Sequence, residues 1–487
     1  MMNTKQNLRL VSEAWDEAMP TFLRYLSIPN KSPAFDKDWQ RNGYMDKAAE
    51  LLLSWTRNRK IKGLKAEIVR LPGRTPLLFV EVPSSYKKSS DSVLLYGHMD
   101  KQPECTGWLP GLSAWKPVFR GDKLYARGAA DDGYSTFAAL IAIENLQAQG
   151  LPHSRCVIVI EACEESGSPD LEFYIQKLSK RIGALSLIVC LDSGAGDYKR
   201  LWLTNSLRGL VGGTLRVSLL KEGVHSGVGT GIAASSLRVA RQLISRIEDE
   251  KTGAIKLKSF NPTIPMSVIK EISKTAKIIG DIKSHLPFLP GVEALNKSSA
   301  ELLLASTWRP TLAVTGADGF PHVADAGNVL RKETAFKLSL RLPPNVDSHR
   351  AMSELKRVLL AKPPYNAKVS FENVESADGW SVPALDPWLD KLVGTVSREY
   401  FGNPYASMGE GGSIPFMAML GKKFPKAQFV VTGVLGPESN AHGPNEFLHL
   451  PFTKKLTAGI CIILNVVPVN MGLAPKNISR NLILLGK

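Results

Sequence analysis

The sequence predicts an α/β fold, a central, mostly parallel sheet with helices on both faces, and an α+β domain inserted into it. Three observations lead to this prediction. Apolar strand-like runs alternate with helical patterns early in the chain, strands with alternating polarity occupy the middle, and the first rhythm returns near the end. A chain of 487 residues also exceeds one ordinary core, which favours at least two domains.

The first part of the chain alternates strands and helices. Residues 135–149 have helical periodicity and are followed by Gly150, a suitable C-cap, and a second helix is expected at 171–180. The predicted strands are 92–96, 156–162 and 185–191. Strands joined through helices pair in parallel, and such sheets bind ligands at the carboxyl ends of their strands.

The middle of the chain has α+β character. Residues 213–220 and 336–342 alternate apolar and polar side chains, as antiparallel strands with one solvent-facing side do. Residues 251–310 are rich in Lys and Pro and are predicted to be irregular, as an elaboration or lid. The other elements expected here are helices at 233–247 and 349–360 and a strand at 367–371.

The first rhythm returns after about Gly379. The expected elements are a helix at 385–401, a strand at 427–431 and a helix at 453–467. We therefore predict one domain formed by residues 1–207 and 379–487, with a second domain, residues 208–378, inserted between its two parts.

Composition argues against several classes of protein. The net charge is +16, but Lys and Arg are spread along the chain without a block, so we expect no nucleic-acid partner. The five cysteines are odd in number and form no CxxC pair, which disfavours a disulfide framework or a cysteine-only zinc site. The N-terminus is charged throughout and the apolar runs are short, so we expect a cytoplasmic protein without membrane contact.

Five short segments hold His, Asp or Glu beside strand ends or in Gly-rich turns. Each segment alone is weak, because a lone carboxylate usually belongs to an ion pair and a lone His to the core or surface. Five together indicate a shared site of carboxylate and imidazole groups. The segments are GHMD (97–100), ARGAADDG (126–133), EACEESGS (161–168), LDSG (191–194) and SNAHGPNE (439–446).

With these segments in this order, the chain resembles the superfamily of dinuclear zinc hydrolases that includes aminoacylases, carnosinases and carboxypeptidases. Acetylornithine deacetylase and succinyl-diaminopimelate desuccinylase belong to the same superfamily. The resemblance extends from about residue 10 to about residue 468. The forms YGHMDKQP and EGGSIP are more similar to the carnosinase-like and dipeptidase-like branch than to the deacetylases.

The resemblance implies two zinc ions per subunit, with manganese or cobalt fitting similar donors. It assigns Asp131 as the ligand that bridges both ions. His98 and Asp192 complete one metal site, and Glu165 and His442 complete the other. Each ion then has nitrogen and oxygen ligands and an open position for water, as a catalytic site requires.

Two further residues receive roles from the same resemblance. Glu164 is the expected general base, which takes a proton from the metal-bound water and passes it to the leaving amine. Asp100 is expected to hold the ring of His98 and to fix its tautomer.

The inserted domain resembles the dimerisation and lid domain of the family. His225, in HSGVGTG, is then an oxyanion-stabilising residue supplied to the partner subunit's site, and a homodimer is expected. Asn328 and Arg341 match positions that contact the substrate carboxylate or stabilise the turnover state. The alternatives are a turn residue for His225 and a sheet-face ion pair for Arg341.

The Gly-rich segment 409–415 resembles a loop that lines the family's substrate pocket. Gly412 and Ser413 are the residues expected near the carboxyl end of the substrate, although a plain connecting turn explains the glycines equally well. The chain departs from the family at Gly133–Tyr134, where relatives often carry Lys-Gly, and at Gly409, where the carnosinase branch often carries Arg. These departures concern substrate choice more than hydrolysis.

The predicted function is hydrolysis of an amide bond, in dipeptides or at the C-terminal residue of short peptides. An N-acyl amino acid deacylase with the same metal chemistry is the first alternative. A binding dimer that has lost turnover is the second, and the presence of all five ligands and the base argues against it.

Overall fold

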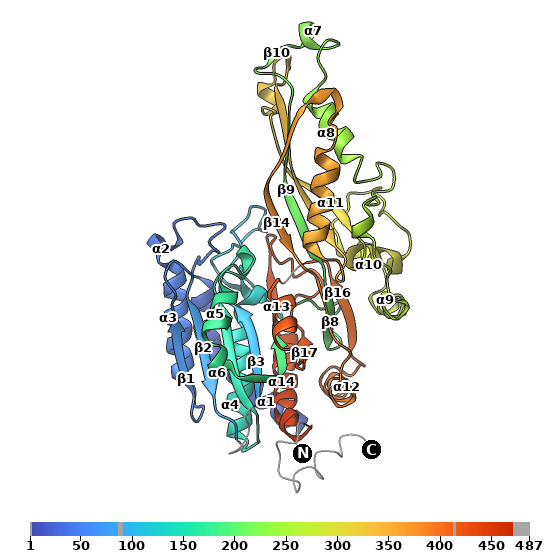
Figure 1. Cartoon of the computed structure of the whole chain (residues 1–487). Coiled ribbons are helices and arrows are strands. Elements are labelled where there is room, and N and C mark those ends of the chain that lie inside the picture. The colour runs from blue at the N-terminus through green and yellow to red at the C-terminus, as the bar shows by residue number, and fades with distance from the viewer. Residues whose placement is uncertain (1, 86–90, 413–414, 471–487) are drawn as a thin grey trace. The chain divides into compact units, whose positions relative to one another are not determined.

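The computed structural model describes residues 2–85, 91–412 and 415–470. The chain forms two compact units (Figure 1). The first contains Met1–Thr204, Val382–Met408 and Met419–Lys487, and the second contains Asn205–Ser381 and Gly409–Ala418. Residues 409–418 therefore group with the second unit, whereas the sequence analysis placed them in the second part of the first domain.

The first unit is built on a six-stranded sheet. Its strands β3, β6, β7 and β17 pair in parallel, and β1 and β2 add an antiparallel edge beside β6. Helices pack around this sheet, as the sequence predicts. The order across the sheet is β1 (Lys65–Val69), β2 (Leu77–Val82), β6 (Arg155–Glu161), β3 (Asp91–His98), β7 (Ala184–Cys190) and β17 (Gln428–Val431).

The register brings three strand ends to one edge of this sheet. His98, the last residue of β3, pairs with Glu161, the last residue of β6. Tyr96 of β3 pairs with Cys190, which ends β7. The segments that leave these strands carry several of the side chains selected from the sequence, so the sheet itself gathers them.

Helix α4 (Tyr134–Ala148) is buried over most of its length. Its residues from Tyr134 to Ile143 are all buried, as expected of a helix that is apolar all round. It contacts β3 and packs against α1 and α14. The helices of this unit are α1 (Thr4–Leu26), α2 (Trp39–Asn42), α3 (Tyr44–Arg57), α4, α5 (Leu171–Lys177), α6 (Ser179–Ile182), α12 (Pro387–Phe401) and α14 (Leu450–Asn470); α13 (Pro415–Lys423) begins in the second unit.

The helix predicted at 171–180 is wrong as a single element. The structure has two helices, α5 and α6, because the backbone at Leu178 leaves the helical region, with φ −92° and ψ 4°. Three short strands, β4 (Val118–Arg120), β5 (Lys123–Tyr125) and β18 (Phe447–His449), form a small separate sheet.

The second unit contains a four-stranded antiparallel sheet in the order β11, β13, β9, β14. The chain enters this unit within β8 (Trp202–Leu207) and leaves it after Ser381. It enters the unit again within β16 (Ala406–Glu410). The strands are β9 (Gly209–Ser218), β11 (Thr311–Asp318), β13 (Glu333–Leu342) and β14 (Lys368–Ala377), with the short strands β10 (Val224–His225), β12 (Val329–Leu330) and β15 (Trp380–Ser381).

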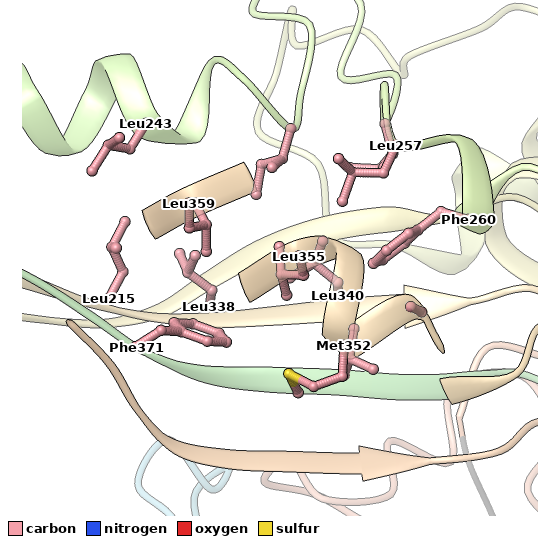
Figure 2. Packing of buried hydrophobic residues seen from close by; sticks show 14 of the residues in the cluster. Leu215, Leu243, Leu257, Phe260, Leu338, Leu340, Met352, Leu355, Leu359 and Phe371 are labelled. Atoms are coloured by element: carbon pink, nitrogen blue, oxygen red, sulfur yellow. The ribbon is translucent and has the colours of Figure 1, made fainter. Parts of the chain in front are cut away.

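One face of this sheet carries the core of the second unit (Figure 2). Leu215, Leu338 and Leu340 of the strands pack against Leu243 of α8 and Leu355 of α11. The alternation of the strands therefore sorts apolar side chains towards the helices. The helices are α7 (Ser226–Gly229), α8 (Ser236–Ile244), α9 (Met266–Ile279), α10 (Ser299–Thr307) and α11 (Ser348–Leu360).

The prediction that residues 251–310 are irregular is wrong. Helices α9 and α10 lie in this range and share a small core, which includes Ile272, Leu304 and Trp308. Lysines on the exposed side of α9 and the prolines before it conceal the helical pattern in the sequence. Among the described residues, we find no helix of sufficient length and apolar character to cross a bilayer.

Candidate metal centre

Two side chains reach the site from the ends of parallel strands. His98 ends β3 and is fully buried. Asp192 follows β7 by two residues and is also buried. The Nε2 atom of His98 lies 3.8 Å from Oδ2 of Asp192 and 3.1 Å from Oδ1 of Asp131. The fold thus brings these three predicted residues together.

Asp131 occupies the centre of the cluster. It lies in the turn Ala129–Gly133, which leads into α4. Its Oδ1 atom faces His98, and its Oδ2 atom lies 3.0 Å from Nε2 of His442. The two oxygens of one carboxylate therefore face two different imidazoles, which is the arrangement that a ligand shared by two cations needs.

Glu165 and His442 complete the group. The Nε2 atom of His442 lies 3.2 Å from Oε2 of Glu165. Glu164 and Glu165 share the short turn Glu164–Ser166 that follows β6. The ligand atoms of His98, Asp131 and Glu165 lie within 4.8 Å of one another, as do those of His98, Glu164 and Asp192. All six side chains therefore converge on one place.

Asp100 supports both the histidine and the glutamate turn. The carbonyl oxygen of Asp100 lies 3.0 Å from Nδ1 of His98, and its Oδ1 atom lies 3.4 Å from the same nitrogen. Its two carboxylate oxygens also accept the backbone N–H groups of Glu164, at 3.1 Å, and Glu165, at 3.0 Å. One buried carboxylate thus fixes the position of three residues of the cluster.

Two residues to which the sequence assigns no role lie at the cluster, Gln102 in contact with Glu165 and Tyr134 in contact with the backbone before Asp192. Nε2 of Gln102 donates to Oε2 of Glu165 at 2.5 Å. The Tyr134 hydroxyl donates to the carbonyl of Leu191, directly before Asp192. Both residues stand in segments that had been noted, GHMDKQP and the departure at Gly133–Tyr134, but the sequence does not show what their side chains reach.

Carboxyl groups outnumber imidazoles in this largely buried cluster. Burial and the neighbouring charges therefore shift the pKa values of these groups. Burial, then the charge of Asp192, raises the pKa of Glu164 well above its usual range. Burial likewise raises the pKa of Asp192 to about 7. Burial lowers the pKa of His442, but its contacts with Asp131 and Glu165 outweigh this and raise it to about 11. When no cation is bound, protons thus balance the excess negative charge of this cluster of carboxylates.

The donor set fits divalent metal ions. Imidazole nitrogen and carboxylate oxygen are the ligands of zinc and related cations in catalytic sites. Within the described part of the chain, Oε1 of Glu165 is buried and has no hydrogen-bond partner in the protein. A buried carboxylate oxygen needs a cation or donor, and a bound metal ion would satisfy it.

The remaining predicted residues belong to the second unit. His225 ends β10 opposite Val329, its side chain is exposed, and its Nδ1 atom accepts the N–H of Gly227 at 3.1 Å. The neighbouring Ser226 donates its N–H to the carbonyl of Asn328 at 2.9 Å. His225 and Asn328 therefore lie side by side in this unit.

Arg341 and Gly412 lie near a second arginine that the sequence analysis missed. Arg208 donates its N–H to the carbonyl of Gly412 at 3.1 Å and its Nε–H to that of Gly411 at 3.1 Å. Burial, then the charge of Arg341, lowers the pKa of Arg208 to about 10. Arg341 itself pairs with Leu210 and Thr311 in the sheet. Ser413 lies outside the described residues.

The chain is similar to a known peptidase family and to two dipeptidases. The sequence model of the protein family described as "Peptidase family M20/M25/M40" matches residues 94–467. A cysteinylglycine-S-conjugate dipeptidase of Corynebacterium striatum is 26% identical over 364 residues, 73% of this chain and 76% of that protein. A Cys-Gly metallodipeptidase, dug1, of Schizosaccharomyces pombe is 25% identical over 374 residues, 74% of this chain and 77% of that protein.

Solved structures confirm the fold predicted from the sequence. Human carnosine dipeptidase 1 superposes with a TM-score of 0.76 at 19% sequence identity, and the match covers 95% of this chain and 99% of that one. At this identity the likeness establishes the architecture, an α/β unit with an inserted domain.

Proposed function

We propose that this chain, which belongs to peptidase family M20/M25/M40, is a metal-dependent dipeptidase. The relatives named above are dipeptidases, which supports this reaction over the removal of acyl groups from amino acids. A dipeptidase also agrees with the resemblance of the forms YGHMDKQP and EGGSIP to the carnosinase-like and dipeptidase-like branch. The substrate is then a short peptide whose single amide bond is hydrolysed.

The single observation that carries the proposal is the position of Asp131 between two histidines. In the proposed arrangement Asp131 bridges two zinc ions, His98 and Asp192 hold the first ion, and Glu165 and His442 hold the second. Manganese or cobalt would suit the same donors. When bound, such ions lower the pKa of a coordinated water and polarise the carbonyl of the scissile bond.

Glu164 is the proposed general base. It lies in the turn beside Glu165, and its carboxylate is within 4.8 Å of the ligand atoms of His98 and Asp192. In its ionised form the carboxylate accepts a proton from the water, and its partly buried position helps it to hold that proton for transfer to the leaving amine. Asp100 keeps this turn in place through the amide of Glu164.

Roles for the second unit remain proposals from the family resemblance. His225 and Asn328 would stabilise the turnover state, and Arg341, Gly412 and Ser413 would contact the substrate carboxylate. A homodimer formed through this unit, with His225 serving the partner subunit, and a cytoplasmic location are likewise predictions. Light scattering during size-exclusion chromatography measures the oligomeric state, and a fully active monomer would contradict the role of His225.

The substrate class is tested with metal-stripped protein that is reloaded with zinc, manganese or cobalt. Dipeptides and N-acetyl amino acids are supplied side by side, and released amino acid is measured. We expect hydrolysis of dipeptides that depends on added metal. Cleavage of the N-acetyl amino acids alone would establish the deacylase, and binding of neither metal nor substrate would leave only a scaffold.

Glu164→Gln tests the general base. The variant keeps the size of the side chain but is unable to accept the proton, so we expect two metals per chain and a loss of about 10²–10⁴-fold in kcat. Metal content is measured by elemental analysis. Glu172→Gln, on the exposed surface of α5, is the control and should keep wild-type turnover. Unchanged kcat in Glu164→Gln would remove Glu164 from this role.

A further inference from the structure

Next to the candidate metal centre lies a buried ion pair that the proposed mechanism does not use. Nη1 of Arg127 lies 2.8 Å from Oε2 of Glu446. Their side chains are 1% and 0% exposed. Replacing a buried pair with apolar residues is often neutral or stabilising, so stability by itself is a weak reason for its presence. The contacts of each partner show another reason.

Glu446 holds the turn that carries Asp131. Its Oε1 atom accepts the backbone N–H groups of Ala130, at 3.0 Å, and Asp131, at 3.2 Å. Its Oε2 atom accepts the N–H of Gly128, at 3.0 Å, in addition to Arg127. Four donors thus point at one carboxylate, and an amide in its place would turn an NH₂ group towards N–H donors.

Arg127 joins the turn of Asp131 to the loop of His442. Its Nη2 atom donates to the carbonyl of Gly443, the residue after His442, at 2.6 Å. Its Nε atom donates to the carbonyl of Pro103, at 2.9 Å. One planar guanidinium therefore fixes three chain segments, and a single ammonium group lacks this fork of donors.

The loop of His442 needs such support. Its residues Glu438, Asn440, His442 and Asn445 all have φ between 53° and 65°, a region that costs L-residues free energy. The side chain of His442 is 57% exposed, so packing holds it weakly. The bond from Arg127 to Gly443 fixes the backbone at the point where the ring of His442 must face Asp131.

We infer that Arg127 and Glu446 are positioning residues of the metal centre, Glu446 for Asp131 and Arg127 for His442. The inference rests on the proposed function, because it presumes two metal ions that share Asp131. It assigns a different function to each residue of the pair. Loss of the Arg127 contacts should lower the affinity for the ion held by Glu165 and His442. Loss of the Glu446 carboxylate should lower the affinity for both ions.

The test titrates zinc into the metal-free protein in competition with a chromogenic chelator, which resolves the two binding steps without any assay of turnover. For Arg127→Met we expect the affinity for the second ion to fall by about 10–100-fold, with the first ion nearly unaffected. For Glu446→Gln we expect both affinities to fall. Arg127→Lys keeps the buried charge opposite Glu446 and, should the Met variant not fold, gives the same selective loss.

Arg155→Met is the matched control. Arg155 also bonds a glutamate, Glu81 at 2.6 Å, and the backbone carbonyls of Arg181 and Ile182, but it begins β6, at the opposite end of the strand from Glu161. Its loss should lower Tm and leave both zinc affinities unchanged. Wild-type zinc affinities in the Arg127 and Glu446 variants, or an equal fall for both ions in Arg127→Met, would overturn the inference. A wild-type protein that binds none of zinc, manganese and cobalt would instead overturn the proposed function.

Discussion

His98 and His442 face opposite oxygens of the same aspartate, but the fold holds them by different means. His98 ends a central strand, is fully buried, and has its N–H bonded to Asp132 and its ring held by Asp100. His442 lies in a loop with positive φ values and is more than half exposed. A strand end positions one side of the site, and side-chain bonds to backbone carbonyls and amides position the other.

Removing the shared ligand should have the largest effect. In Asp131→Asn one ligand oxygen becomes an NH₂ group, so one carboxylate no longer serves both sides. We expect at most one metal per chain and a fall in kcat/KM of more than about 10³-fold, which is about 4 kcal/mol of transition-state stabilisation. Elemental analysis and dipeptide hydrolysis measure both quantities.

Asp132→Asn is the control for this variant. Asp132 is buried next to Asp131, so the variant makes the same change from carboxylate to amide one residue away from the shared ligand. Its oxygen is still able to accept the N–H of His98, which Oδ2 accepts at 3.1 Å in the native protein. Two metals bound to Asp131→Asn would show that the two sides of the site do not depend on a shared ligand.

The two histidines should differ when each is replaced by alanine. His98→Ala leaves Asp100 and Asp131 short of a buried partner, so we expect the metal-free protein to lose about 1–3 kcal/mol of unfolding free energy. His442→Ala removes an exposed ring, so the free energy of unfolding should fall by less. This variant should also keep one of the two metal sites. Urea denaturation in the presence of a chelator measures the difference. Equal losses would mean that the two sides are held alike.

A smaller effect should appear in the pH dependence of stability. Glu161 ends β6 on the strand side of the site, and burial raises its pKa from 4.5 to about 7. The folded protein then retains a proton that the unfolded chain releases. This stabilisation is complete below about pH 4.5 and is lost as the pH rises through about 7, a decrease of up to about 3 kcal/mol.

Glu161→Gln should remove this part of the pH dependence. The Tyr96 hydroxyl and the Ser168 hydroxyl both donate to Oε1 of Glu161, so a glutamine oxygen keeps the two bonds. Urea denaturation of the metal-free protein at several values between pH 5 and about 7 measures the slope. An unaltered slope in the variant would mean that the strand side is wetter than its burial indicates.

The same contrast explains what the sequence was able to predict. The segments that hold His98 and Asp192 follow readable apolar runs, and a Gly-rich turn holds Asp131, so the five segments together indicated a shared site. The resemblance to a family then supplied the roles. The partners of Glu165 and His442 were not predictable in this way. Gln102, Arg127 and Glu446 act on backbone groups or on residues far away in the chain, and such contacts leave no periodic pattern.

The prediction of secondary structure was wrong where the amino-acid composition was misleading. Residues 251–310 were expected to be irregular because lysines and prolines suggested a loop, but α9 turns its lysines to solvent and buries Ile272 and Ala276 against α10. An amphipathic helix around a very small core gives a weak signal. Arg208, beside Gly412, was also missed, since only the pairing of β9 with β13 brings it near the predicted residue Arg341.

Four of the five cysteines, Cys156, Cys163, Cys190 and Cys461, are buried, and the fifth, Cys105, is exposed. The Sγ atom of Cys105 lies 3.5 Å from the carbonyl oxygen of His442. The native chain thus offers a single attachment point for a fluorophore or spin label, directly beside the loop in question. Rearrangements of that loop can be followed spectroscopically in the wild-type protein, without introducing any new thiol.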